Sequence, residues 1–174
     1  MNAILRSRTQ ITAEQSSPSR LRVCVLFVCV ANSCRSQMAE AFAIRYGSDV
    51  LRAESAGIRP APRVSTTTRK VMREKDLAVP DQPPKGFGRF NLEEFDLIVN
   101  LSGLALPCTG SVPVLNLSVP DPAGRDEEFF REVRDRIEFQ VQRLAQDLRS
   151  ACLKYMQPST FSQAAPHLRR AAYY

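Results

Sequence analysis

The sequence predicts an α/β fold, a three-layer sandwich in which a central sheet of about four parallel strands is covered by helices on both faces. Short apolar stretches rich in Val, Leu and Ile alternate with helical patterns along the chain, which is typical of parallel sheets with crossover helices. The last helical pattern carries a single apolar stripe, as a helix packed on a sheet requires. A length of 174 residues suits one domain.

The first half of the predicted domain contains two strands and one helix. Residues 22–30 (RVCVLFVCV) are apolar and largely β-branched, which favours a central strand buried on both faces. Met38 and Phe42 share one face of a helix that we expect to end before Gly47. Residues 50–55 form a short second strand. The polar stretch between the first strand and the helix is therefore a loop at the carboxyl end of a central strand.

The second half contributes a short helix, two strands and a long helix. Ser65 and the threonines after it offer the N-cap of the short helix. Residues 95–101 (FDLIVNL) form a third buried strand, and residues 112–117 form a fourth, which Pro113 places at a sheet edge. Asp126 can cap the long helix. The apolar stripe of that helix consists of Phe130, Val133, Ile137, Val141, Leu144 and Leu148.

Charge and hydropathy exclude two classes of protein. The formal net charge is +6, but residues 1–20 carry +2 and residues 150–174 carry +3, so the remainder is nearly neutral and offers no nucleic-acid surface. The longest apolar run has nine residues, whereas a membrane span needs roughly 20. We expect a flexible N-terminal extension over residues 1–20, one domain over residues 21–149 and a C-terminal tail over residues 150–174.

Cysteine usage indicates a reducing compartment. The five cysteines are an odd number and are not spaced like the disulfide framework of a secreted protein. Cys29, Cys34, Cys108 and His167 make a poor metal site, because no Cys-x2-Cys or His pair is present. We therefore expect a cytoplasmic, monomeric protein with no bound metal or other cofactor, and with neither a membrane nor a nucleic acid as partner.

The loop after the first strand contains the candidate catalytic and oxyanion-binding residues. It reads CVANSCRS, and five residues separate Cys29 from Arg35. Such a loop can turn its backbone N–H groups inward as an anion nest, to which the helix N-terminus adds partial positive charge. The planar guanidinium of Arg35 suits a tetrahedral oxyanion. The predicted oxyanion-binding residues are Val30, Ala31, Asn32, Ser33, Cys34 and Arg35.

Cys29 lies beneath this predicted nest. Helix N-termini and nearby cations favour the thiolate form of a cysteine, so we expect Cys29 to be a nucleophile. Ser36 can donate its hydroxyl to that thiolate. A core cysteine followed by chance by a surface arginine is the other interpretation, but the strand before, the helix after and the polar residues between favour the site.

These motifs resemble those of the low-molecular-weight protein tyrosine phosphatases and of the arsenate reductases that share their fold. The matching stretches are VLFVCVANSCRSQMAEAFA, AESAG, DLIVNLSG and VPDPAG followed by EEFFREVRDRIE, in family order over roughly residues 21–149. One departure is Ala31, where the family loop usually has glycine. The resemblance implies Cys29 as nucleophile, Arg35 as oxyanion clamp and Asp121 as general acid.

Within that family the sequence favours an arsenate reductase. Phosphotyrosine phosphatases need aromatic walls, whereas Ala123 and Gly124 follow the Asp-Pro pair and residues 57–64 contain no aromatic. Gln37 also looks like the reductase branch. We expect a small oxyanion, arsenate or phosphate, as substrate. One alternative is a tyrosine phosphatase, which hydrolyses phosphate monoesters, for example those of a phosphoprotein, through a cysteinyl-phosphate. Another is a catalytically idle module that binds oxyanions or senses redox state.

Reduction of arsenate needs a second thiol to release arsenite. Thioredoxin-coupled relatives use two more cysteines after the third strand. In this chain Ser102 stands about where the first would be, and Cys108 lies near the second. Cys108 is therefore the first candidate for the resolving thiol, with Cys34 and a small external thiol as alternatives. We expect an external thiol reductant, either thioredoxin or glutathione with glutaredoxin.

Overall fold

Four parallel strands form the central sheet in the computed structural model of the protein, which describes residues 22–79 and 82–155. The strands are β1 (Val23–Cys29), β2 (Leu51–Gly57), β3 (Leu97–Asn100) and β4 (Val114–Asn116). Their order is β2-β1-β3-β4, so β1 is paired on both sides. The predicted α/β class and parallel sheet are confirmed. Strand β4 lies at an edge with all its residues exposed, as Pro113 predicts.

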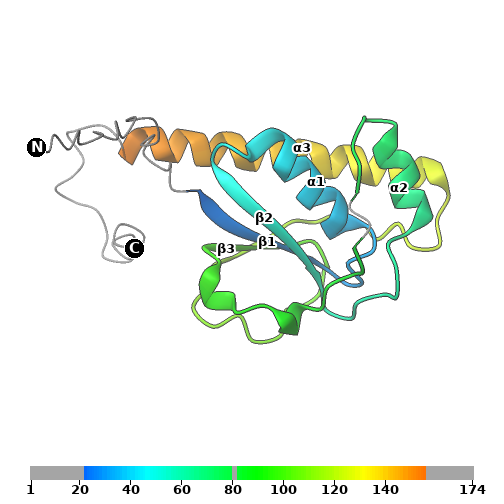
Figure 1. The fold of residues 1–174 in the computed structure, drawn as a ribbon, viewed down its shortest axis with the longest axis horizontal. Coiled ribbons are helices and arrows are strands. Elements are labelled where there is room, and N and C mark those ends of the chain that lie inside the picture. Colours follow the sequence, from blue (N-terminus) through cyan, green and yellow to red (C-terminus); the bar gives the residue numbers. More distant parts are fainter. Residues whose placement is uncertain (1–21, 80–81, 156–174) are drawn as a thin grey trace, which may run out of the picture.

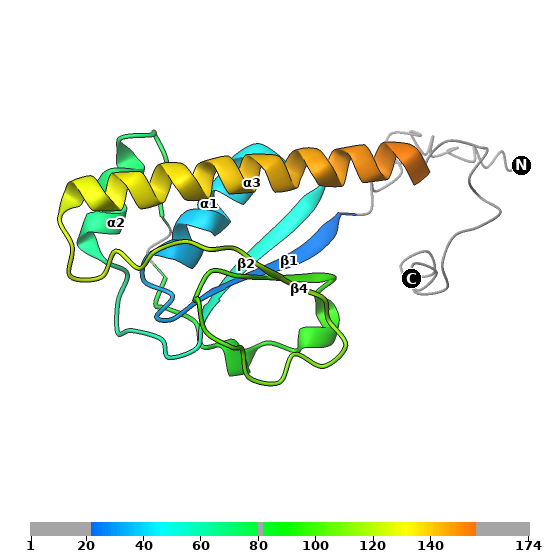
Figure 2. The same cartoon turned by 180° about the vertical axis from the view of Figure 1, so that it is seen from behind.

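The two faces of the sheet are covered by different kinds of helix (Figure 1). One face is covered by the α-helices α1 (Arg35–Gly47), α2 (Thr66–Arg73) and α3 (Glu127–Tyr155). The opposite face is covered by the 3-10 helices η1 (Phe87–Arg89) and η2 (Leu92–Glu94). Along β1, Phe27 belongs to the larger core under the α-helices, while Leu26 and Val28 belong to the smaller core on the other side. Figure 2 shows the same layers from behind.

The predicted helix caps are present. The Ser65 hydroxyl accepts a hydrogen bond from the Thr68 N–H at 3.4 Å, and the Asp126 carboxylate accepts one from the Phe129 N–H at 3.0 Å. Helix α3 continues past Arg149, the last residue of the predicted domain, to Tyr155. Its apolar stripe is fully buried in the first half of the helix, at Phe130, Val133, Ile137 and Val141. Residues 1–21 and 156–174, which make up most of the two predicted tails, lie outside the described residues, as do residues 80–81.

The described part of the chain contains neither a membrane-spanning helix nor a cluster of metal-ligating side chains. None of its helices is both long enough and apolar enough to cross a bilayer. No three His, Cys, Asp or Glu side chains within residues 22–79 and 82–155 come together in a way that could hold a metal ion. His167 lies outside these ranges.

Candidate active site

The loop between β1 and α1 lies at the carboxyl end of the sheet, where ligands bind in open α/β folds. It is held from outside by the chain that follows β2. The carbonyl oxygens of Val30, Ala31 and Ser33 each accept a hydrogen bond of 2.8–3.0 Å from a backbone N–H in residues 59–65. Because these carbonyls point outward, the N–H groups of the loop are turned toward its interior.

Several of those N–H groups have no acceptor. Within the described residues, the backbone N–H groups of Ser33, Cys34 and Arg35 donate to no other group. Cys34 is the N-cap residue of α1, and no side chain caps this helix. Unpaired N–H groups at a helix N-terminus carry partial positive charge, and such groups stabilise a bound anion.

Cys29 ends β1 beneath the loop and is 2% exposed. Its sulfur accepts a hydrogen bond from the Asn32 N–H at 3.2 Å and lies 3.1 Å from the Ser36 hydroxyl. The structure therefore places Ser36 beside the predicted nucleophile. The Cys29 sulfur is therefore held between the Asn32 N–H and the Ser36 hydroxyl at the N-terminus of α1.

The Asn32 side chain organises the loop, a role that the sequence pattern did not predict. Asn32 is fully buried and has a left-handed backbone conformation, with φ 49°. Its Nδ2 donates to the hydroxyls of Ser36 and Ser55, both at 2.9 Å. Its Oδ1 accepts from Gln37 Nε2 at 3.1 Å and from the Lys85 N–H at 2.7 Å. Asparagine tolerates positive φ better than most residues, which is the sequence signal that could have found it.

Gly57 allows β2 to approach this loop closely. A Cβ atom at Gly57 would lie 2.7 Å from the Asn32 nitrogen and 2.8 Å from the Ala31 carbonyl carbon, too close for any side chain. Ala31 itself is not among the described non-glycine residues with positive φ. The loop therefore accommodates alanine where the family usually has glycine without placing it in the left-handed region.

Arg35 is 3% exposed, and its guanidinium is held on two sides. Nη1 donates to the carbonyls of Leu101 at 2.8 Å and Val119 at 3.3 Å, while Nη2 pairs with the Asp121 carboxylate. Nε is buried and has no acceptor among the described residues. A buried N–H without a partner is costly, and an oxyanion in the loop would satisfy it.

Asp121 reaches the site from a distant part of the chain and stays half-exposed, at 46% of its side chain. Its Oδ1 accepts a hydrogen bond from the Ala123 N–H at 3.1 Å, which fixes the Asp-Pro turn. Farther along, the guanidinium of Arg125 lies 4.2 Å from the centre of the Phe129 ring. This ring is the aromatic nearest in sequence to the Asp-Pro turn, and Arg125 covers one of its faces.

The two candidate resolving thiols have opposite environments. Burial raises the pKa of the Cys34 thiol, and the charges of Cys29 and Asp121 add to this, while the neighbouring hydroxyl groups of Thr68 and Ser33 act against it. Cys108 is exposed in the loop between β3 and β4. The structure thus brings Cys34 into the electrostatic field of Cys29 and leaves Cys108 open to solvent.

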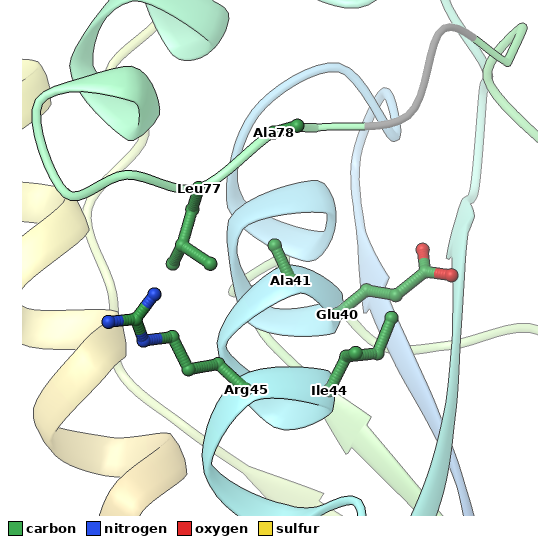
Figure 3. A pocket seen from close by; sticks show the side chains of 6 residues that line it. All are labelled: Glu40, Ala41, Ile44, Arg45, Leu77 and Ala78. Carbon is green, nitrogen blue, oxygen red and sulfur yellow. The ribbon is translucent and has the colours of Figure 1, made fainter.

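A cavity of about 320 Å³ lies between α1 and the chain that follows α2 (Figure 3). It is lined by Glu40, Ala41, Ile44, Arg45, Leu77 and Ala78. Figure 3 shows the Glu40 carboxylate directed away from Arg45 and Leu77, so only the stem of this residue faces the cavity. The cavity lining is mostly apolar and includes none of the loop residues.

The chain is similar to known enzymes over its described part. Residues 24–153 match the family described as low molecular weight phosphotyrosine protein phosphatase. Arsenate reductase 1 of Bacillus cereus is 36% identical over 126 residues, which cover 70% of this chain and 93% of that protein. The glutaredoxin arsenate reductase of Synechocystis is 32% identical, with 69% and 94% covered. The crystal structure of an Archaeoglobus fulgidus arsenate reductase superposes with a TM-score of 0.64 at 37% identity, covering 70% of this chain and 98% of that one.

Proposed function

The chain belongs to the low molecular weight phosphotyrosine protein phosphatase family, and we propose that it acts within this family as an arsenate reductase. One observation carries the proposal: Cys29 lies beneath a loop in which the N–H groups of Ser33, Cys34 and Arg35, and the buried Arg35 Nε, lack an acceptor among the described residues. These donors suit a tetrahedral oxyanion that has no organic group to hold. The similarity to arsenate reductases supports the same assignment.

The first step is attack of the Cys29 thiolate on arsenic(V). A sulfur–arsenic bond forms, and one arsenate oxygen leaves as water. Asp121 lies at the site through its contact with Arg35, and when the oxyanion replaces it on the guanidinium it acts in its protonated form and supplies a proton to that leaving oxygen. The loop N–H groups and Arg35 hold the remaining oxygens and their negative charge.

The second step is attack of another thiolate on the Cys29 sulfur. A disulfide forms and the sulfur–arsenic bond breaks. Its electron pair stays on arsenic, which leaves as arsenite, arsenic(III). We assign this attack to Cys108, because burial holds Cys34 in the protonated and less nucleophilic form. An external thiol reductant, of the thioredoxin or glutaredoxin class, then reduces the disulfide and restores Cys29.

Phosphate-ester hydrolysis is the second candidate function, since the same thiolate and the same nest serve attack on phosphorus. Phosphotyrosine also needs a surface for its ring. Residues 57–64 contain no aromatic side chain, and Arg125 covers one face of the Phe129 ring. We therefore expect poor hydrolysis of phosphotyrosine beside good binding of arsenate and phosphate.

The test compares both reactions in one preparation. Arsenate turnover is measured with thioredoxin, with glutathione plus glutaredoxin, and with neither, in the wild type, Cys108→Ser and Cys34→Ser, with Cys24→Ser as a control thiol at the other end of β1. Loss of turnover in Cys108→Ser alone supports the internal relay. Turnover retained in both variants assigns the second step to an external thiol. If there is no arsenate turnover with any reductant and phosphotyrosine is hydrolysed fast, the proposal of a reductase is wrong and the protein is a phosphatase.

A further inference from the structure

Lys85 contacts the side chain of Asn32 in the loop. Its backbone N–H donates to Asn32 Oδ1 at 2.7 Å, and its carbonyl accepts a hydrogen bond from the Gly57 N–H at 2.8 Å. The second contact joins the chain before η1 to the end of β2, where Gly86 bridges Gly57. The backbone at Lys85 is thereby attached both to β2 and to the residue that donates to the Cys29 sulfur.

The ammonium group of Lys85 reaches the same asparagine by a second route. It donates to Glu54 at 2.5 Å and lies 3.8 Å from the Glu40 carboxylate. Glu40 accepts a hydrogen bond from the Ser55 hydroxyl, which in turn accepts one from Asn32 Nδ2. A continuous chain of contacts therefore runs from Lys85 through Glu40 and Ser55 to Asn32.

The ammonium group of Lys85 offsets the negative charges of Glu40 and Glu54. Burial raises the pKa of Glu40, and the neighbouring Glu54 charge adds to this, while the hydrogen bond from Ser55 and the charge of Lys85 oppose it. Without the ammonium, two carboxylates would face each other behind the loop, and Glu40 would favour its protonated form. A protonated Glu40 can donate to Ser55 instead of accepting from it, which disturbs the hydrogen bonds of Asn32.

We propose that Lys85 is a positioning residue for the oxyanion site, holding Asn32 by its backbone N–H on one side and by its ammonium through Glu40 and Ser55 on the other. It touches neither Cys29 nor the oxyanion. Its effect is to keep the Asn32 N–H directed at the Cys29 sulfur and the loop N–H groups directed inward. The inference rests on the proposed function only in that the loop must bind an oxyanion, and it holds for arsenate and for phosphate.

The test uses Lys85→Met in the full chain, with two measurements that do not depend on which reaction the enzyme performs. These are the affinity for inorganic phosphate and the rate at which iodoacetamide alkylates Cys29, followed from pH 5 to 9. We expect both to fall by about ten- to hundredfold, because a small displacement of a preorganised site is costly. Added methylammonium, which can replace the missing ammonium between the two glutamates, restores part of the alkylation rate.

Lys75→Met is the matched control. Lys75 also pairs with two carboxylates, Glu138 at 2.9 Å and Asp135 at 3.2 Å, but these lie on α3. We expect this variant to keep the wild-type phosphate affinity and alkylation rate. If Lys85→Met does not fold, Lys85→Arg and Glu40→Gln carry the same measurements, with near-normal values expected for the arginine and reduced values for the glutamine.

The results separate the two proposals. A folded Lys85→Met protein with wild-type phosphate affinity and alkylation rate overturns the role of Lys85, whatever the enzyme does. If Lys85→Met does not fold, an unchanged Glu40→Gln protein overturns it equally. A wild-type protein that binds no phosphate, and whose Cys29 reacts no faster than Cys152, instead overturns the proposed function.

Discussion

Two arginines are buried in the described part of the chain, and they differ in whether Nε has an acceptor. Arg35 at the proposed oxyanion site is 3% exposed, and Arg134 between α2 and α3 is 5% exposed. Both donate to a backbone carbonyl and pair with a carboxylate. The Nε of Arg134 also donates to Asp135 at 2.8 Å, whereas the Nε of Arg35 has no acceptor.

This difference distinguishes an arginine that holds a fold together from one that is prepared for a ligand. Arg134 joins α3 to the end of α2, because it donates a hydrogen bond to the Val71 carbonyl and pairs with Glu74. Its Nε is satisfied by another group of the protein, Asp135. Arg35 has its orientation set by the Leu101 and Val119 carbonyls, but it keeps one buried donor. A buried donor that a folded protein leaves unpaired is expected where a ligand completes the hydrogen bonds.

The largest expected effect is that of Arg35→Lys. A lysine cannot present two parallel N–H groups to one oxyanion or reach the same carbonyls in a planar fork. We expect arsenate turnover to fall by about 1,000-fold, in line with the loss of an oxyanion donor. Steady-state kinetics and circular dichroism together check this. Turnover close to wild type would show that the backbone N–H groups alone suffice.

Asp121→Asn should have the next largest effect. The asparagine keeps a similar shape but cannot supply the proton for the leaving oxygen, so turnover should fall by about 100-fold. The affinity for phosphate should change little or rise, because Arg35 loses a competing carboxylate. Isothermal titration with inorganic phosphate measures this second quantity. An Asp121→Asn protein with unchanged turnover would reduce Asp121 to a turn residue.

Arg134→Lys is the counterpart of the first variant and should affect stability instead of activity. Removing the donors to the Val71 carbonyl and Asp135 should lower the free energy of unfolding by about 1–2 kcal/mol. Urea unfolding followed by circular dichroism measures this. We expect unchanged arsenate turnover at a temperature where both proteins are folded, and a marked loss of turnover would contradict the division between the two arginines.

The smallest effect concerns the pH dependence of the α2–α3 contact. The hydrogen bond from Arg131, followed by that from Arg134, lowers the pKa of Glu74 to about 2, from an ordinary value of 4.5. The contribution of Glu74 to stability is therefore complete above about pH 4.5 and is lost as the pH falls toward 2. Thermal unfolding from pH 6 to 2 should show a steeper loss for the wild type than for Glu74→Gln. Parallel curves for the two proteins would mean that this ion pair contributes nothing.

Local patterns were sufficient to predict the strands, the long helix and the loop that holds Cys29. A buried strand, a helical stripe such as that from Phe130 to Val141, and a helix cap such as Asp126 each depend on residues close in sequence. The two 3-10 helices on the second face were not predicted, because elements of three residues are too short to show a period. The family assignment also followed from such local motifs.

Contacts between distant residues required the tertiary structure. Arg35 meets Asp121 across 86 positions of the chain, and Asn32 meets Lys85 across 53. The close approach of Gly57 to Asn32 likewise depends on how β2 packs beside the loop. The sequence by itself determined which groups are available for the proposed binding of an oxyanion, because the loop N–H groups, the Cys29 thiol and the Arg35 guanidinium lie within one short segment. Only the tertiary structure decided which hydrogen bonds of these groups are made within the protein and which donors remain for a ligand. The reason is that their partners come from segments far away in the sequence, and the packing of such segments cannot be derived from sequence spacing.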